Sequence, residues 1–350
     1  MLPEKLPMRV NYIPIQGYNM NSVTQNMGVV AYPPHERLRY TQMNFRFSGH
    51  ESFPCRYTWL PKVYRLLKED SKAFSDEEAA MVALGVGKNM VRSIRFWAQV
   101  TDIAKPGPEG GYLTTEFADS IFGDDGYDPF LEDIRTLWLL HWKMSTQVTE
   151  PLFAWDYLLN RWQHPEITRF EVTAAFKREA ARMERKLSQV TLEQHFDTFL
   201  HTYVPTRSRK GEILEDNLDS PLVELELIQR VGERKLDKGG RHEVIFAFRR
   251  ESKPEISPQL FIYCLNDFWG TRRSRERTLS FRDVSVGHGS PGQVFKLPER
   301  DLKERLDSVK IDSSGQFDYQ ESASLQQVLR LHDCDSDLLD NVYVKEHSYA

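Results

Sequence analysis

The sequence predicts a mainly α-helical fold with small β hairpins, made of a winged helix-turn-helix domain, a helical middle and a second, winged-helix-like C-terminal domain. Three observations support this expectation. Apolar residues recur at helical spacing through most of the chain. A tight glycine turn separates two helices near residue 85, and stretches that suit hairpins follow two separate groups of helices. The length of 350 residues fits two to three domains of about 150 residues each.

We expect four parts along the chain. Residues 1–43 hold several Pro, Asn and Gln residues and show no helical period, so they are expected to form an N-terminal extension. The winged helix-turn-helix domain covers 44–150 and the helical region 151–220. The winged-helix-like C-terminal domain covers 221–350.

The elements of the first domain follow from local signals. Ser75 and Glu78 match the S-x-x-E capping box, in which each side chain satisfies a backbone donor at a helix start. Gly85 suits the left-handed residue that ends a helix. The turn-rich stretch 105–111 is expected to be the wing between two short extended pieces. Helices are expected at 56–68, 76–84, 89–100, 114–121 and 130–144.

The rest of the chain repeats part of this order. A helix, a short helix, a helix and a hairpin occur both at 56–114 and at 258–319, with Gly315 inside the second hairpin at 309–319. Helices are expected at 155–162, 170–187, 192–203, 258–269, 279–286 and 298–309, and strands at 222–231 and 243–249.

The composition is that of a folded protein from a reducing compartment. With 40% hydrophobic and 12% aromatic residues the chain can build a core, which excludes a wholly disordered protein. Cys55, Cys264 and Cys334 are odd in number and widely spaced, so neither a disulfide framework nor a zinc knuckle is expected. Short apolar runs exclude a membrane span, and the N-terminus does not resemble a signal peptide. We therefore expect a cytoplasmic protein without a membrane partner.

The helix after the glycine turn is the candidate DNA-recognition helix, because the steep angle of such a pair lets the second helix enter a major groove. Residues 88–100 carry three basic and no acidic side chains, a local charge of +3 in a chain of −5. The candidate DNA-binding residues on its exposed face are Lys88, Asn89, Arg92, Arg95 and Gln99. The alternative is a winged helix that makes protein contacts. A phosphate-binding loop is rejected, because Val82 and Asn89 break its pattern.

Three further basic clusters each carry a net charge of +3, at 169–186, 207–210 and 272–277. In the last cluster, Arg272, Arg273 and Arg275 follow an aromatic helix end, so contact with a DNA backbone is expected there. For each cluster taken singly, a solvated loop or helix face is the alternative.

Three groups of residues are candidates for catalysis. Converging carboxylates can hold a divalent metal, Mg²⁺ or Mn²⁺, that activates water for phosphodiester cleavage. His50 could act as a general base or metal ligand with Glu51 as its partner. The alternatives are helix caps, solvated acidic loops and a polar turn over the first helix. The candidate catalytic residues are His50, Glu51, Glu132, Asp133, Asp216 and Asp219. His195 and His201 are expected to have packing or surface roles.

Two long motifs resemble a bacterial family of unknown function that is associated with DNA phosphorothioation, the SspB-type DNA-nicking proteins. They are FSGHESFP at 47–54, followed by RYTWL at 56–60, and LGVGKNMVRSIRFW at 84–97. The resemblance extends over about 45–335 and includes the carboxylates near 132 and 216 and the segment 290–297. It implies DNA modification and defence, with a cysteine desulfurase, an ATPase and a sulfur-inserting enzyme as protein partners. It does not assign catalytic residues.

The sequence thus favours a DNA-binding component of a phosphorothioation system that nicks one strand of double-stranded DNA to allow sulfur insertion. Two alternatives remain. One is a non-catalytic DNA-binding scaffold subunit of the same system, and the other is a winged-helix transcriptional regulator.

Overall fold

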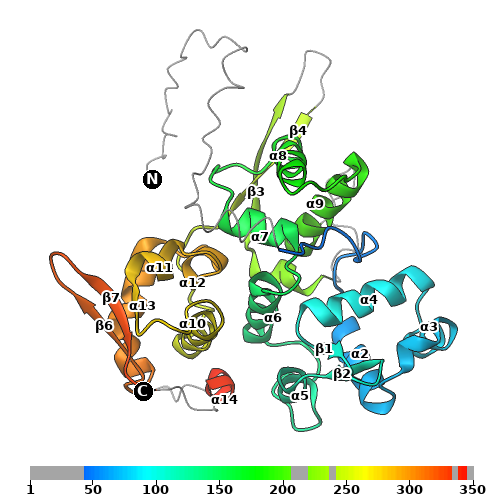
Figure 1. The fold of residues 1–350 in the computed structure, drawn as a ribbon, viewed down its shortest axis with the longest axis horizontal. Helices are drawn as coiled ribbons and strands as arrows, with labels where there is room; N and C mark the ends of the chain where they lie inside the picture. The colour runs from blue at the N-terminus through cyan, green and yellow to red at the C-terminus, as the bar shows by residue number, and fades with distance from the viewer. Residues whose placement is uncertain (1–42, 206–219, 236–241, 333–337, 345–350) are drawn as a thin grey trace, which may run out of the picture. The chain divides into compact units, whose positions relative to one another are not determined.

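The chain is mainly helical, with small antiparallel sheets at three places in the described residues (Figure 1). The computed structural model describes residues 43–205, 220–235, 242–332 and 338–344. The predicted fold class is confirmed at this level. None of the described helices combines the length and the apolar character that a bilayer span requires.

The first group of elements follows the predicted order of helix, short helix, helix and hairpin. The hairpin strands pair antiparallel, with Ala104 opposite Thr114 and Pro106 opposite Tyr112. These elements are α2 (Trp59–Glu69), η1 (Ala73–Ser75), α3 (Glu77–Leu84), α4 (Lys88–Val100), β1 (Ala104–Pro106), β2 (Tyr112–Thr114), α5 (Glu116–Phe122) and α6 (Ile134–Thr146).

The predicted cap of α3 is wrong by one residue. Ser75 closes the preceding 3₁₀ turn, and the carboxylate of Asp76 accepts the backbone N–H groups of Glu78 and Ala79 instead. The carboxylate satisfies two orphan donors, and its negative charge lies at the positive end of the helix dipole, which is favourable. The predicted stop at Gly85 is confirmed, since this residue is left-handed with φ of 67°.

The middle of the chain is helical, as predicted, but two boundaries differ by five residues or more. Helix α8 ends at Arg182, short of 187, because Glu184 adopts a left-handed φ of 56° and turns the chain. The stretch 221–225 is a 3₁₀ turn that begins at a proline, so the strand expected at 222–231 starts later. The elements are α7 (Phe153–Asn160), α8 (Arg169–Arg182), α9 (Gln189–Tyr203), η3 (Pro221–Leu225), β3 (Ile228–Lys235) and β4 (His242–Phe248).

The last group of elements contains a three-stranded sheet of order β5-β7-β6. The hairpin expected at 309–319 is wrong, because α13 continues to Asp312 and Gly315, with φ of 85°, only turns the chain into β6. The partner of β6 is β7, further along the chain. The elements are α10 (Pro258–Arg272), β5 (Thr278–Ser280), α11 (Phe281–Val286), α12 (Pro291–Val294), α13 (Glu299–Asp312), β6 (Phe317–Glu321), β7 (Gln326–Arg330) and α14 (Leu338–Tyr343).

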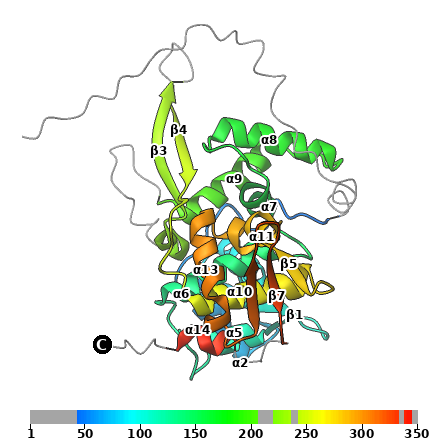
Figure 2. The same ribbon diagram turned by 90° about the vertical axis from the view of Figure 1, so that its left-hand side faces the viewer.

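Helix α6 lies between the two groups and is buried along most of its length. It packs against α7, α10, α12 and η3, which explains the apolar run in its sequence. Its residues Trp138, His141 and Trp142 have almost no exposed surface. The described residues form one compact unit, and the boundaries expected at 150 and 220 stay predictions. Figure 2 shows the β3–β4 hairpin beside α8, joined by a bridge between Ile167 and Phe246.

Candidate nucleic-acid interface

Helix α4 presents one apolar and one cationic face. Its buried side, which includes Val91, Ile94 and Trp97, packs on α2 and α3. Gly85 and Gly87 lie in the short turn that sets the direction of the helix, and no side chain caps its first turn. Lys88 and Asn89 are exposed, whereas Arg92, Arg95 and Gln99 are half-buried along the same helix. The predicted DNA-binding residues of this helix therefore share its non-core side.

One carboxylate holds the first two cations of α4. Glu77, from α3, lies 2.6 Å from Lys88 Nζ and 2.8 Å from Arg92 Nε. Hydrogen bonds from these two side chains lower the pKa of Glu77, so it stays ionised. Both pairs are largely exposed to solvent, where ion pairs contribute little and competing anions can replace the carboxylate.

A second arginine, which sequence reasoning missed, packs against α4. The Arg46 guanidinium sits 4.7 Å from the centre of the Phe96 ring, and its Nη1 is 3.9 Å from Glu150. Burial lowers the pKa of Arg46 and the charge of Arg95 lowers it further, while Glu150 and Tyr112 act in the opposite direction. Arg46 thus adds a further cation to the α4 surface, where an anion would stabilise the charged guanidinium. The position of Arg46 directly before the 47–54 motif was the available signal.

A short strap, residues 44–47, brings Arg46 to α4. Arg46 donates its N–H to Pro151 O and accepts from Phe153 N–H, which fixes the strap against the start of α7. In Figure 1 the strap lies between α4 and α9. Gly49 follows with φ of 109°, and a Cβ there would lie 2.8 Å from the Phe96 ring. Only glycine fits this approach of the strap to α4 without strain.

The turn directly after the strap contains His50, which forms a buried pair with a second histidine. His50 Nε2 and His195 Nδ1 are 3.2 Å apart, and the backbone N–H of Ala154 donates to His195 Nε2. That buried donor places the proton of His195 on Nδ1, so His195 donates to His50. His50 in turn donates from Nδ1 to Thr198 Oγ1, 3.1 Å away. The N–H of Ser52 also lies near this nitrogen, but Ser52 is exposed and water can satisfy it.

Both histidines are held neutral. Burial, together with the charge of Arg46, lowers the pKa of His50 to about 4, and burial with the neighbouring His50 lowers that of His195. The backbone oxygen of His50 accepts a hydrogen bond from Ser93 of α4. The pair therefore positions the turn between α4 and α9. Glu51 is exposed, whereas the His50 ring is buried and contacts His195 and Thr198, so the structure does not show the expected partnership.

The acidic candidates on the described residues are engaged in local structure. The carboxylate of Asp128 accepts the N–H groups of Glu132 and Asp133, at 2.7 and 3.0 Å. Asp133 caps α6 and binds Arg135, which lowers the pKa of Asp133 against the opposing effect of burial. Glu132 is exposed. Asp216 and Asp219 lie outside the described residues, as does the basic cluster 207–210. The described residues contain no group of three potential metal ligands.

The second basic cluster is partly used inside the fold. Arg272 donates to Thr146 O at the end of α6. Arg273 lies 3.7 Å from Asp283 and 4.0 Å from Glu276. Arg275 is exposed. Of the three predicted contacts, Arg275 has the most accessible side chain.

A histidine–carboxylate pair that the sequence analysis missed ties α7 to the loop before α12. His288 Nε2 lies 2.7 Å from the buried Asp156, and Asn160 accepts the N–H of Gly289. The residues are more than a hundred positions apart, so no local pattern indicates the pair.

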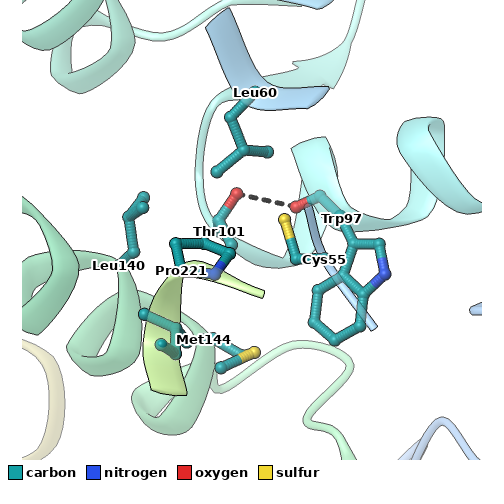
Figure 3. Close-up of a pocket in the computed structure, with 8 residues that line it drawn as sticks. Cys55, Leu60, Trp97, Thr101, Leu140, Met144 and Pro221 are labelled. Carbon is teal, nitrogen blue, oxygen red and sulfur yellow. Dashed lines mark hydrogen bonds between the residues drawn. The ribbon is translucent and has the colours of Figure 1, made fainter. Parts of the chain in front are cut away.

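A small apolar cavity of about 10 Å³ lies where α2, α4, α6 and η3 meet (Figure 3). The Thr101 hydroxyl at its wall donates to Trp97 O. Burial raises the pKa of the Cys55 thiol, which makes this cysteine unreactive. The cavity is a packing gap next to the candidate interface. The lining residues are Cys55, Leu60, Trp97, Thr101, Leu140, Met144, Pro221 and Leu222.

Known proteins resemble the chain in both sequence and fold. The family described as "Protein of unknown function (DUF4007)" matches residues 47–343. A magnesium ion-bound SspB crystal structure is similar, with a TM-score of 0.74 and 25% identity over 88% of this chain and 92% of that chain. A second SspB crystal structure, with a TM-score of 0.73 and 24% identity over 89% and 92%, is similar in fold. No curated protein sequence matches. The predicted resemblance is confirmed.

Proposed function

The chain belongs to the DUF4007 family of proteins of unknown function, and we propose that it is a cytoplasmic DNA-binding component of a bacterial DNA phosphorothioation system. One observation carries the proposal. The exposed side of α4 bears cations and no carboxylate of its own, and Arg46 adds a further cation over the Phe96 ring of the same helix. Such a surface suits the phosphates of duplex DNA. The two sequence motifs imply a role in DNA phosphorothioation, and the likeness to SspB supports that role. We therefore assign the DNA contact by α4 to it.

In this proposal α4 and the β1–β2 hairpin act as a winged helix on DNA. A helix of about 10–12 Å diameter fits a major groove that is about 12 Å wide. Arg92 and Arg95 would contact phosphates or guanine edges, and Asn89 and Gln99 have the amide groups that pair with adenine. Lys105 in the exposed part of the hairpin would contact the adjoining backbone.

Glu77 holds Lys88 and Arg92 in the absence of DNA. A phosphate that arrives between the two cations would replace the carboxylate, since an exposed ion pair contributes only about 0–1 kcal/mol. Glu77 would thus hold the two cationic side chains in position on α4, although its carboxylate competes with the phosphate for them.

The second part of the proposal is that the protein nicks one strand of the bound DNA. The similar SspB structure binds a magnesium ion, and Mg²⁺ or Mn²⁺ is the cofactor that the motifs led us to expect. The described residues do not fit a metal site, because Asp128 and Asp133 are held by backbone donors and Arg135. We therefore assign no catalytic step to them. Asp216 and Asp219, outside the described residues, are the remaining pair of candidate ligands.

The test is a supercoiled plasmid incubated with the full chain in Mg²⁺, Mn²⁺ or EDTA, beside binding of a labelled duplex. We expect binding in all three conditions and open circular plasmid with metal only. Binding without nicking under every metal condition would favour the scaffold alternative and remove the enzyme proposal. Absence of binding would overturn the DNA-binding proposal.

The protein partners proposed for this role are a cysteine desulfurase, an ATPase and a sulfur-inserting enzyme. Genes for sulfur transfer next to the gene for this chain would support the assignment, and co-purification of their products with the tagged chain is the direct measurement. No described feature favours the regulator alternative, for which an unrelated operon would be expected.

A further inference from the structure

The turn between α4 and the hairpin, residues 101–103, sets where the wing lies relative to the proposed recognition helix. Asp102 adopts a left-handed φ of 62°, so the chain changes direction here. Beyond the hairpin, the N–H of Thr115 donates to Ile103 O, and the Thr115 hydroxyl donates to Asp102 O. Both ends of the hairpin are therefore joined at this turn, and a rotation of the turn would move the whole wing.

Helix α6 holds the α4 side of this turn through a glutamine. Gln147 follows the last residue of α6, and its Nε2 donates to Gln99 O and Val100 O, at 3.1 and 3.0 Å. These two carbonyl groups belong to the last turn of α4, where the regular helical donors are missing. An amide that binds both carbonyl groups fixes the end of the recognition helix against α6.

A lysine one helical turn earlier on α6 holds the turn itself. Lys143 Nζ lies 3.3 Å from Asp102 Oδ2, and only 16% of the lysine side chain is exposed. The same Nζ lies 5.6 Å from the centre of the Tyr263 ring of α10. Burial lowers the pKa of this lysine, but Tyr263, Asp267 and Asp102 raise it by more, so the side chain stays charged. Lys143 therefore ties the turn to α6 and α10 through an ion pair that is largely shielded from water.

We propose that Lys143 and Gln147 of α6 are positioning residues for DNA binding, which fix the angle between α4 and the β1–β2 wing so that Lys105 of the wing reaches the backbone of the duplex that α4 enters. This inference rests on the proposed DNA binding by α4. Lys105 is exposed on the wing. A wing that is already held in place loses less conformational entropy on binding, so the phosphate contact of Lys105 adds more affinity.

The test is a double-mutant cycle on the salt dependence of binding to a labelled duplex. In the otherwise unaltered chain, K105A removes one phosphate contact and should lower the slope of log affinity against log salt by about 0.9. In the background D102N/Q147A, which breaks both contacts with α6, K105A should lower the slope by less than about half of that amount. Asparagine tolerates the left-handed φ at position 102, so the backbone turn is kept.

A merely structural role of the α6 contacts would lower stability without changing the effect of K105A, so urea unfolding is measured for each variant. The control background is D318N, which removes the carboxylate partner of Lys310 in the second group. K105A should keep its full effect in that background. D102N alone supports the same cycle if the double variant does not fold.

The outcomes separate this inference from the proposed function. If K105A lowers the slope equally in the unaltered chain and in D102N/Q147A, the positioning role is overturned and DNA binding by α4 stands. If R92A/R95A weakens binding but K105A has no effect in the unaltered chain, the wing does not contact DNA and the inference is overturned as well. If the unaltered chain does not bind duplex DNA, both proposals fail.

Discussion

The two helix–helix–hairpin groups of this chain share an order of elements and differ in charge. In the first group α4 has three cations and no acidic residue, and two of those cations share the single carboxylate of Glu77. In the second group α13 carries four cations, and each has its own carboxylate partner. These pairs are Arg300–Glu304, Lys303–Glu321, Arg305–Asp301 and Lys310–Asp318.

The difference shows that element order provides a shape but not a function. The paired charges of α13 hold its own helix and the neighbouring sheet, and they leave little positive field for a nucleic acid. On α4 a single carboxylate serves two of the three cations, so this helix keeps a net positive charge. The first group is therefore the DNA-binding candidate, although sequence order alone treats both groups alike.

The largest effect is expected at His50, a buried residue in the turn that leads into the first group. His50 has a folded pKa of about 4, against about 6.5 in an unfolded chain. Between these values the unfolded chain binds a proton that the folded chain does not, so the free energy of unfolding falls as the pH falls. His50 alone would contribute a loss of about 3 kcal/mol between pH 6.5 and 4.

Chemical denaturation at pH 7.5 and pH 4.5 measures this loss. The variant H50Q should be less stable at pH 7.5 but should lose less stability on acidification than the unaltered chain. The matched control is H332Q, at an exposed histidine that follows β7 in the second group. Equal acid sensitivity of H50Q and the unaltered chain would contradict the neutral, buried state of His50.

The second effect concerns DNA binding by the two helices. The variant R92A/R95A should reduce the salt slope by about 1.8, which corresponds to a loss of about sixtyfold in affinity at about 0.1 M salt. The matched variant R300A/K303A removes two charges from α13 and should leave affinity unchanged. Fluorescence anisotropy with a labelled duplex measures both. A similar loss in both variants would show that the comparison between the helices is wrong.

The third effect compares two left-handed glycines, Gly49 in the turn before the first group and Gly315 in the second group. Gly315 has open space around its Cα, so G315A should cost about 1 kcal/mol from its φ alone. At Gly49 an added Cβ would also meet the Phe96 ring at 2.8 Å, so G49A should cost about 2–3 kcal/mol. Urea unfolding of both variants measures the difference, and equal costs would contradict the close approach of the strap to α4.

The smallest effect concerns the carboxylate that competes with DNA. The variant E77Q should raise affinity for duplex DNA about twofold to threefold, because Lys88 and Arg92 lose a partner that contributes less than about 1 kcal/mol. E304Q, which removes the partner of Arg300 on α13, is the control and should not change affinity. A loss of affinity in E77Q would mean that Glu77 positions the two cations for DNA.

Signals between near neighbours predicted most of the elements. The helical spacing of apolar residues, the stop at Gly85 and the cationic side of α4 depend on residues within about four positions of one another, which one helical turn brings together. The competition between Ser75 and Asp76 for the start of α3 is also local, but it depends on where the preceding 3₁₀ turn ends. The sequence pattern did not decide between them.

By itself the sequence determined the helical class, the cationic side of α4 and, through two long motifs, the family. The tertiary structure alone decided which distant residues meet. His50 contacts His195 across 145 positions, and Arg185 contacts the strap across about as many. The physical reason is that such contacts depend on how whole elements pack, and no local periodicity encodes that packing. For the same reason the strap and Arg46 became candidates for the DNA surface only once the packing of the strap against α4 was known.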